Sequence, residues 1–182
     1  MILFFFLVVA MFLAVVVQHF IGPLPPMGAR VLLMPVVMFY GALALPLPGM
    51  LALATVGGLM WDCLHAEIVD GNYEIAVGWS VILYAVLGGL MSGFRPLFQR
   101  GRWEIHCLLS GACVSVIVLA EYLVITFRRD PVTFVFNQQV WWNIGASGLV
   151  ALGLSPFFFF ALNWVAHLTG YDPQPLRRVR KR

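Results

Sequence analysis

Two acidic residues lie at unusual places in this sequence, one at the end of a long apolar run and one inside another. They are Asp62 and Glu121. A carboxylate at such a place is costly unless it is hydrated, paired or hydrogen-bonded, so each is a candidate for function. Asp62 could cap a helix or bind a partner, or it could lie in the lipid headgroup layer. Glu121 could instead be structural: protonated, reaching the interface, or bonded to another helix through Asn143 or Ser147.

Neither a metal site nor a catalytic site is expected. His65 follows Asp62 by three positions, but two ligands without a third do not make a zinc site. The cysteines Cys63, Cys107 and Cys113 are odd in number and lack CxxC spacing, so we expect them to act as small buried hydrophobic residues. The chain has no GxSxG, HExxH or phosphate-binding glycine motif. We therefore predict that it is not an enzyme and holds no cofactor.

Small and amide side chains suggest contacts between helices instead. Asn143 and Asn163 lie in the last apolar segment, where an amide that bonds across helices contributes about 1 kcal/mol. Small residues one helical turn apart allow two backbones to approach closely. Such pairs are Ala10 and Ala14, Gly89 and Gly93, and Gly111 and Ser115. We expect these residues to pack helices together or to bind a partner.

The composition places all these residues in a membrane protein. Of the 182 residues, 62% are hydrophobic and only 10% are charged, which leaves too little polar surface for a soluble domain. The runs 1–29 and 31–61 contain no charged residue. We therefore predict an all-α membrane protein, with one transmembrane domain at 1–170 and a basic tail at 171–182.

A spanning helix needs about 20 mostly apolar residues. Six segments qualify as predicted spans, the second and third being short: 1–20, 30–47, 49–64, 75–94, 106–127 and 140–168. The Pro46-Leu47-Pro48-Gly49 sequence predicts a tight turn between the second and third. The tryptophans near the predicted helix ends, Trp103, Trp141, Trp142 and Trp164, are typical of rings in the headgroup layer.

The basic residues predict the orientation. Five of them form the tail: Arg177, Arg178, Arg180, Lys181 and Arg182. With both termini in the cytoplasm, eight basic residues lie inside and three outside, as the positive-inside rule favours. No basic face with interleaved aromatic residues accompanies the tail, so we expect it to anchor the chain to anionic lipid and not to bind nucleic acid.

The central part of the chain resembles a known family. The stretch 34–43 reads Met-Pro-Val-Val-Met-Phe-Tyr-Gly-Ala-Leu and is followed by Pro46, and 57–62 reads Gly-Gly-Leu-Met-Trp-Asp. A short polar loop with Gly71 and a glycine-rich helix up to Gly93 come next. These features resemble the rod shape-determining protein MreD family. The resemblance covers about residues 34–94, a third of the chain, and Asn143 also fits it.

The resemblance implies a non-enzymatic subunit of the bacterial cell-elongation complex in the cytoplasmic membrane. Members bind MreC and act together with MreB, RodA and a class B penicillin-binding protein. They help to couple cytoskeletal filaments to lateral peptidoglycan synthesis and cell shape. The family is also similar in fold to the substrate-binding subunits of energy-coupling-factor vitamin transporters.

That second similarity supplies the alternative function. A solute-binding subunit would hold a small molecule in a pocket at its outer face. The residues expected to line the pocket are Trp61, Asp62, Tyr73, Glu74 and Trp79. The row of Ala10 and Ala14 resembles the patch with which those subunits dock on their transmembrane partner.

We expect that removal of residues 176–182 weakens the orientation with both termini in the cytoplasm. The deletion removes five of the eight basic residues on that side and leaves three against three. A reporter fused to the N-terminus should then appear on both sides of the membrane. Replacing the four arginines of the tail with lysine keeps the charge and should preserve the orientation. An unchanged orientation of the truncated chain would contradict this role of the tail.

Overall fold

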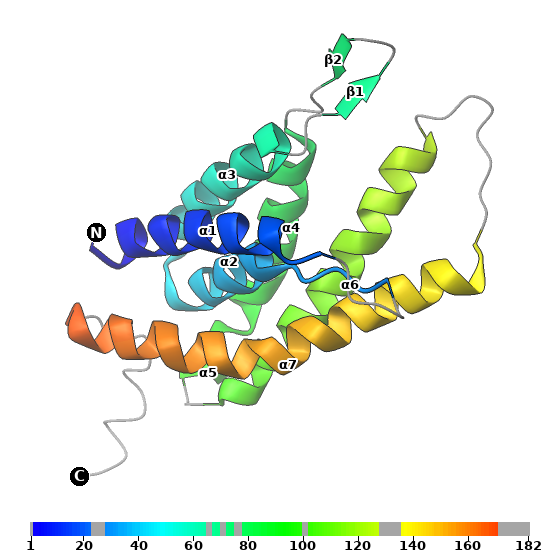
Figure 1. The fold of residues 1–182 in the computed structure, drawn as a ribbon. Helices are drawn as coiled ribbons and strands as arrows, with labels where there is room; N and C mark the ends of the chain where they lie inside the picture. The colour runs from blue at the N-terminus through cyan, green and yellow to red at the C-terminus, as the bar shows by residue number, and fades with distance from the viewer. Residues whose placement is uncertain are drawn as a thin grey trace.

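The computed structural model describes residues 2–22, 28–64, 67–69, 72–74, 78–99, 102–127 and 136–170 (Figure 1). The elements are α1 (Ile2–Phe20), α2 (Leu33–Ala44), α3 (Leu47–Leu64), β1 (Glu67–Val69), β2 (Asn72–Glu74), α4 (Trp79–Gly93), α5 (Arg95–Gln99), α6 (Trp103–Phe127) and α7 (Gln138–Leu168). The fold is therefore a helical bundle. The strands β1 and β2 pair antiparallel, with Glu67 opposite Glu74, where the sequence predicted only a loop.

Four helices, α1, α3, α6 and α7, are long and apolar enough to cross a membrane. The chain is accordingly a multi-pass membrane protein. The helices found in the predicted spans 30–47 and 75–94 are shorter than predicted: α2 has 12 residues and α4 has 15. At about 1.5 Å per residue, α2 is only about 18 Å long, against about 30 Å of hydrocarbon. All six predicted segments contain a helix, and α5 is an additional short one.

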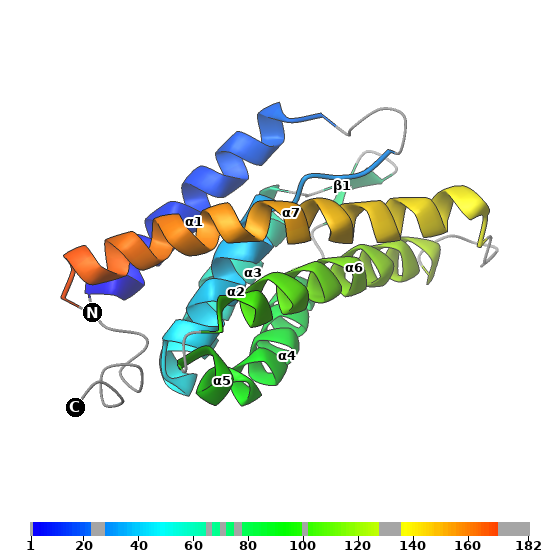
Figure 2. The ribbon, with the colours of Figure 1, turned by 90° about the horizontal axis from the view of Figure 1, so that it is seen from below.

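The short helix α2 is the centre of the bundle. All of its residues are buried, and it contacts α1, α3, α4, α5, α6 and α7. Figures 1 and 2 show α2 surrounded by the other helices from both directions. A helix that is apolar on every side belongs in such a place, because it has no polar face to turn outward.

The N-terminal end of α2 is capped by a side chain from another helix. Leu32 precedes the helix and makes no side-chain cap hydrogen bond. Instead, Gln18 Oε1 of α1 accepts from the backbone N–H groups of Leu33 at 3.0 Å and Met34 at 3.3 Å. The next residue is Pro35, which has no N–H to satisfy. The side-chain oxygen of one buried amide therefore accepts hydrogen bonds from most of the backbone N–H groups that the start of a helix leaves unpaired.

The C-terminal end of α2 is satisfied in the same way. Ser92 Oγ of α4 donates to the carbonyl oxygen of Ala42 at 3.1 Å, and Arg95 Nη2 of α5 donates to that of Ala44 at 3.4 Å. These carbonyls belong to the last helical turn, which has no partners of its own. The predicted tight turn follows at once, since α3 begins at Leu47.

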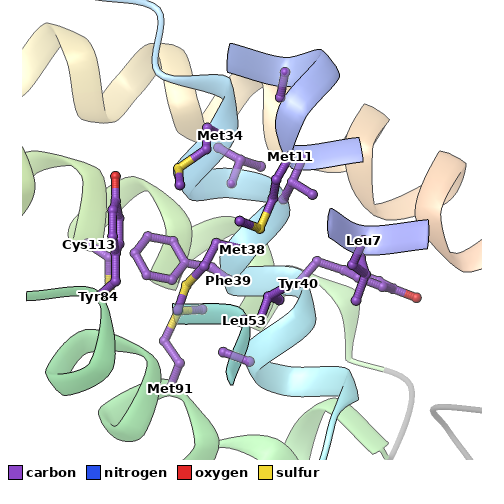
Figure 3. Packing of buried hydrophobic residues seen from close by; sticks show 14 of the residues in the cluster. Leu7, Met11, Met34, Met38, Phe39, Tyr40, Leu53, Tyr84, Met91 and Cys113 are labelled. Atoms are coloured by element: carbon purple, nitrogen blue, oxygen red, sulfur yellow. The ribbon is translucent and has the colours of Figure 1, made fainter. Parts of the chain in front are cut away.

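Glycines allow the methionine-rich core to close. A Cβ atom at Gly57 would lie 2.6 Å from Met11 Cε and 2.8 Å from Met34 Cε. Figure 3 shows Met11, Met34 and Met38 converging on one region of the core. Flexible methionine side chains fill irregular space of this kind. At Gly58 a Cβ atom would instead meet backbone atoms of Val81 at 2.5 Å, so α3 and α4 touch there.

The predicted packing row of Gly111 and Ser115 is confirmed. A Cβ atom at Gly111 would lie 3.0 Å from the carbonyl oxygen of Gly148 on α7. Ser115 Oγ donates to the carbonyl oxygen of Ile144 at 3.2 Å. These small residues let α6 and α7 lie against each other along their length (Figure 2).

Both views place the beginning of α1 and the end of α7 at the same end of the bundle (Figures 1 and 2). The four tryptophans predicted at helix ends are exposed: Trp103, Trp141, Trp142 and Trp164.

Replacing Gln18 with leucine should destabilise the protein, because two buried N–H groups of α2 would lose their acceptor. The expected cost is about 2 kcal/mol, typical of unsatisfied buried donors. Thermal unfolding in a mild detergent measures it. Gln139→Leu is the matched control, since Gln139 is exposed in the first turn of α7. Equal melting temperatures for the two variants would contradict the capping role of Gln18.

Candidate functional site

An ion pair and a hydrogen bond join three parts of the fold near the start of α2. Arg30 Nη1 lies 3.3 Å from Glu121 Oε2 of α6. The backbone N–H of Arg30 donates to Ser147 Oγ of α7 at 3.0 Å. The segment that leads into α2 is thus tied to α6 by charge and to α7 by a hydrogen bond.

Glu121 is held by a cation and an indole, and not by the partners proposed from the sequence. Its side chain is only 19% exposed. Trp61 of α3, itself buried, also hydrogen-bonds the carboxylate. Of the alternatives left open for Glu121, a bond to Asn143 or Ser147 is absent among the described residues, because the nearby guanidinium offers a stronger, charge-assisted hydrogen bond. The second carboxylate oxygen, Oε1, is buried without a hydrogen-bond partner among the described residues.

Asp62 has a local structural role within the chain. Its Oδ2 accepts from the backbone N–H of Gly78 at 2.7 Å. Gly78 directly precedes α4 and has a φ of 101°, which favours glycine. A carboxylate at the start of a helix is also favoured by the helix dipole. Of the alternatives for Asp62, the structure contains the capping interaction.

A cavity of about 850 Å³ lies beside the ion pair, between α1, the segment before α2, and the ends of α3 and α6. Its size is in the range of small-molecule sites. Its walls are mostly apolar, and its polar side chains are few. The polar and tryptophan side chains in it are Gln18, His19, Arg30, Trp61 and Glu121.

A second cavity, of about 100 Å³, lies on the α7 side of the same ion pair. Arg30 and Glu121 line it together with Asn143. The amide oxygen of Asn143 is buried and has no hydrogen-bond partner within the described ranges. The ion pair therefore separates two spaces, one large and apolar and one small and more polar.

Comparison with known proteins identifies no relative: no family model, no curated protein and no solved structure matches this chain. The site is therefore interpreted from its own geometry. The MreD resemblance stays a prediction.

The predicted packing residues fall into different environments. Ala14 is buried in the core, and Ala10 is partly buried against it. Gly89 and Gly93 face open space, with nothing within 4 Å of a Cβ atom at either position. Neither glycine therefore packs against another of the helices that the structure describes. For Asn163, the buried amide oxygen has no partner in the part of the chain that the structure describes.

Some predicted positions lie outside the described residues. They are Gly71, His65 and the tail residues Arg177, Arg178, Arg180, Lys181 and Arg182. Within the described ranges, no group of three or more His, Cys, Asp or Glu residues could hold a metal ion. Cys107 and Cys113 are buried as predicted, but Cys63 is exposed at the last turn of α3, which corrects that prediction.

Gln18 and Arg30 are site residues that no sequence pattern had indicated. Both were visible: Gln18 is a lone amide in a run without charge, and Arg30 is the single charged residue before Asp62. In the predicted topology Arg30 is one of the three basic residues outside. Their partners could not be read from spacing, since Arg30 and Glu121 are 91 positions apart.

His106 is also buried, but it belongs to the core. Its Nε2 lies 3.4 Å from the carbonyl oxygen of Val36, and its ring packs near Tyr40 and Phe159. Phe98 completes the aromatic cluster against Tyr40. This environment is typical of a histidine that packs between helices.

Replacing Arg30 with leucine should destabilise the chain more than replacing both members of the ion pair. The single change leaves Glu121 unpaired in a mostly apolar site, whereas Arg30→Leu with Glu121→Leu removes both charges. We expect a difference of about 1 to 2 kcal/mol, between the values for exposed and buried pairs. Thermal unfolding in detergent measures it. Glu104→Leu, at an exposed position of α6, is the neutral control. Additive effects of the two changes would contradict the coupling.

Proposed function

We propose that this chain is a non-enzymatic integral membrane subunit of the bacterial cell-elongation complex and that it binds the single transmembrane helix of MreC. In this proposal it lies in the cytoplasmic membrane, crosses it six times and has both termini inside. The four long apolar helices support a membrane location. The observation that carries the proposal is an uncovered row of small residues on α4.

The segment that resembles the MreD family forms the inner part of the bundle. It contains the central helix α2 and the closely packed pair α3 and α4. Gly57 and Gly58 of the resembling motif lie at the contacts that close this region. The likeness therefore involves positions with a physical reason to be glycine.

The outward face of α4 is different. Ile82, Val86 and Leu90 are exposed on it by 61%, 56% and 63%. Gly89 and Gly93 lie along the same face and have open space above them. In lipid, helices associate through close packing, and small residues let a second backbone approach. The helix α4 has no charged residue, so its face suits an apolar partner helix.

This arrangement supports a role in assembly. A bundle that docks the helix of MreC would hold it beside the other membrane subunits. Contacts with MreB, RodA and the class B penicillin-binding protein would then be made directly or through MreC. Coupling of filaments to lateral peptidoglycan synthesis, and hence to cell shape, would follow from holding these parts together.

Co-purification with MreC in a mild detergent tests the proposal. We expect the wild-type chain to recover MreC, and the double variant Gly89→Leu, Gly93→Leu to lose at least tenfold of it. The matched control is Gly145→Leu with Gly153→Leu on α7, where a Cβ atom also meets open space. Both pairs should fold, since leucine favours helix over glycine.

Two results would contradict the proposal. Wild-type protein that is purified without MreC, from cells that express both, would count against the function. Equal recovery by the α4 and α7 variants would leave the function standing but would exclude the α4 face as the docking surface.

The solute-binding alternative has less support. Among its expected pocket residues, Trp61 lines the large cavity, but Asp62 bonds to Gly78 and neither Asp62 nor Trp79 is part of the lining. The side chains of Tyr73 and Glu74 lie outside the described set. Ala14 is 5% exposed and packs in the core of this chain, so the row of Ala10 and Ala14 is not free to dock on a partner.

A further inference from the structure

We propose that the large cavity between α1, α3 and α6 binds an anionic phospholipid, with the phosphate at Arg30 and an acyl chain along α1. The inference goes beyond the assembly function and does not depend on MreC. It rests on the shape of the cavity, its walls and the kind of hydrogen-bonding groups that it offers.

The cavity is open on one side, and its walls come largely from a helix that faces lipid. Phe12, Val16 and Phe20 of α1 line it and are also exposed, by 55%, 39% and 83%. Because α1 is long and apolar enough to cross a membrane, its exposed face meets acyl chains. On the opposite walls Leu64 and Ile125 are also apolar. An acyl chain is the natural occupant of such a space.

The polar groups of the cavity are mainly donors. A guanidinium has five N–H groups, and Arg30 uses one side-chain nitrogen on Glu121 among the contacts of the described residues. The side-chain oxygen of Gln18 already accepts from two backbone N–H groups of α2, so the polar group that Gln18 has left is its NH₂, which is a donor. Trp61 is engaged by Glu121, and the imidazole of His19 can donate or accept. A ligand of this site should therefore offer hydrogen-bond acceptors.

The geometry of the guanidinium favours a phosphate as that acceptor. The ion pair with Glu121 fixes the guanidinium at the edge of the cavity. The Arg30 side chain is 55% exposed, so its free N–H groups remain accessible. Arginine binds phosphate oxygens through charge-assisted hydrogen bonds in a planar, often bidentate geometry. A headgroup phosphate above an acyl chain matches both parts of the site.

Native mass spectrometry of the purified full chain tests this proposal. The protein is reconstituted with phosphatidylglycerol or with phosphatidylethanolamine and then released from bulk lipid. We expect one retained phosphatidylglycerol per chain and at least tenfold less phosphatidylethanolamine. Arg30→Gln should abolish this preference. Val16→Trp should block the acyl chain, whereas Val17→Trp should not, because Val17 is also exposed on α1 but lies outside the cavity lining.

The outcomes separate the sources of the ligand. Displacement of the lipid by millimolar inorganic phosphate would show that only the headgroup is recognised and would overturn a lipid site. Equal retention of the two lipids would overturn the preference for an anion. Retention by Val16→Trp equal to that by Val17→Trp would mean binding elsewhere on the surface. Because none of these experiments includes MreC, their failure is independent of the assembly function.

Discussion

The burial of α2 is the constraint on which the rest of this fold depends. Because α2 has no contact with water, the unpaired backbone N–H and C=O groups at its two ends must form hydrogen bonds with other parts of the protein. Gln18 supplies the acceptor at one end, and Ser92 and Arg95 supply donors at the other. These contacts fix α1 and the α4–α5 corner relative to the centre. The remaining helices pack around a core whose orientation is already set.

The candidate site follows from the same arrangement. The chain enters α2 through a segment that carries Arg30, and the position of α2 brings this arginine to Glu121 of α6 and Ser147 of α7. Gln18, which caps α2, also lines the large cavity. The groups that stabilise the centre of the bundle are thus next to those that give the cavity its chemistry. A change at one of them affects both stability and binding.

Hydropathy was sufficient to predict where the helices lie, because each needs a long apolar run. It overestimated α2, since the flanking Val31, Leu32 and Leu45 are apolar but not helical, and it overestimated α4, which begins only after Gly78. The packing of Gly111 with Ser115 depends on local chemistry and was predicted correctly. The tight turn was predicted at about the right place, although Leu47, Pro48 and Gly49 form the first turn of α3. The partners of Arg30, Glu121 and Gln18 were not, because their spacing in the chain carries no information about which helices become neighbours. For the same reason, the open face above Gly89 could not be distinguished from the filled space at neighbouring Gly88.

The shortness of α2 also has a consequence for biogenesis. A helix of about 18 Å is shorter than the hydrocarbon core of the bilayer, so on its own it is a poor stop-transfer segment for the insertion machinery. Its close linkage to α3, which is long enough to cross, means that the two would enter the membrane as a hairpin. The amide of Gln18 is by then already synthesised on α1. The first three helices therefore form the earliest unit of the protein that can satisfy the start of α2, before α6 and α7 leave the ribosome.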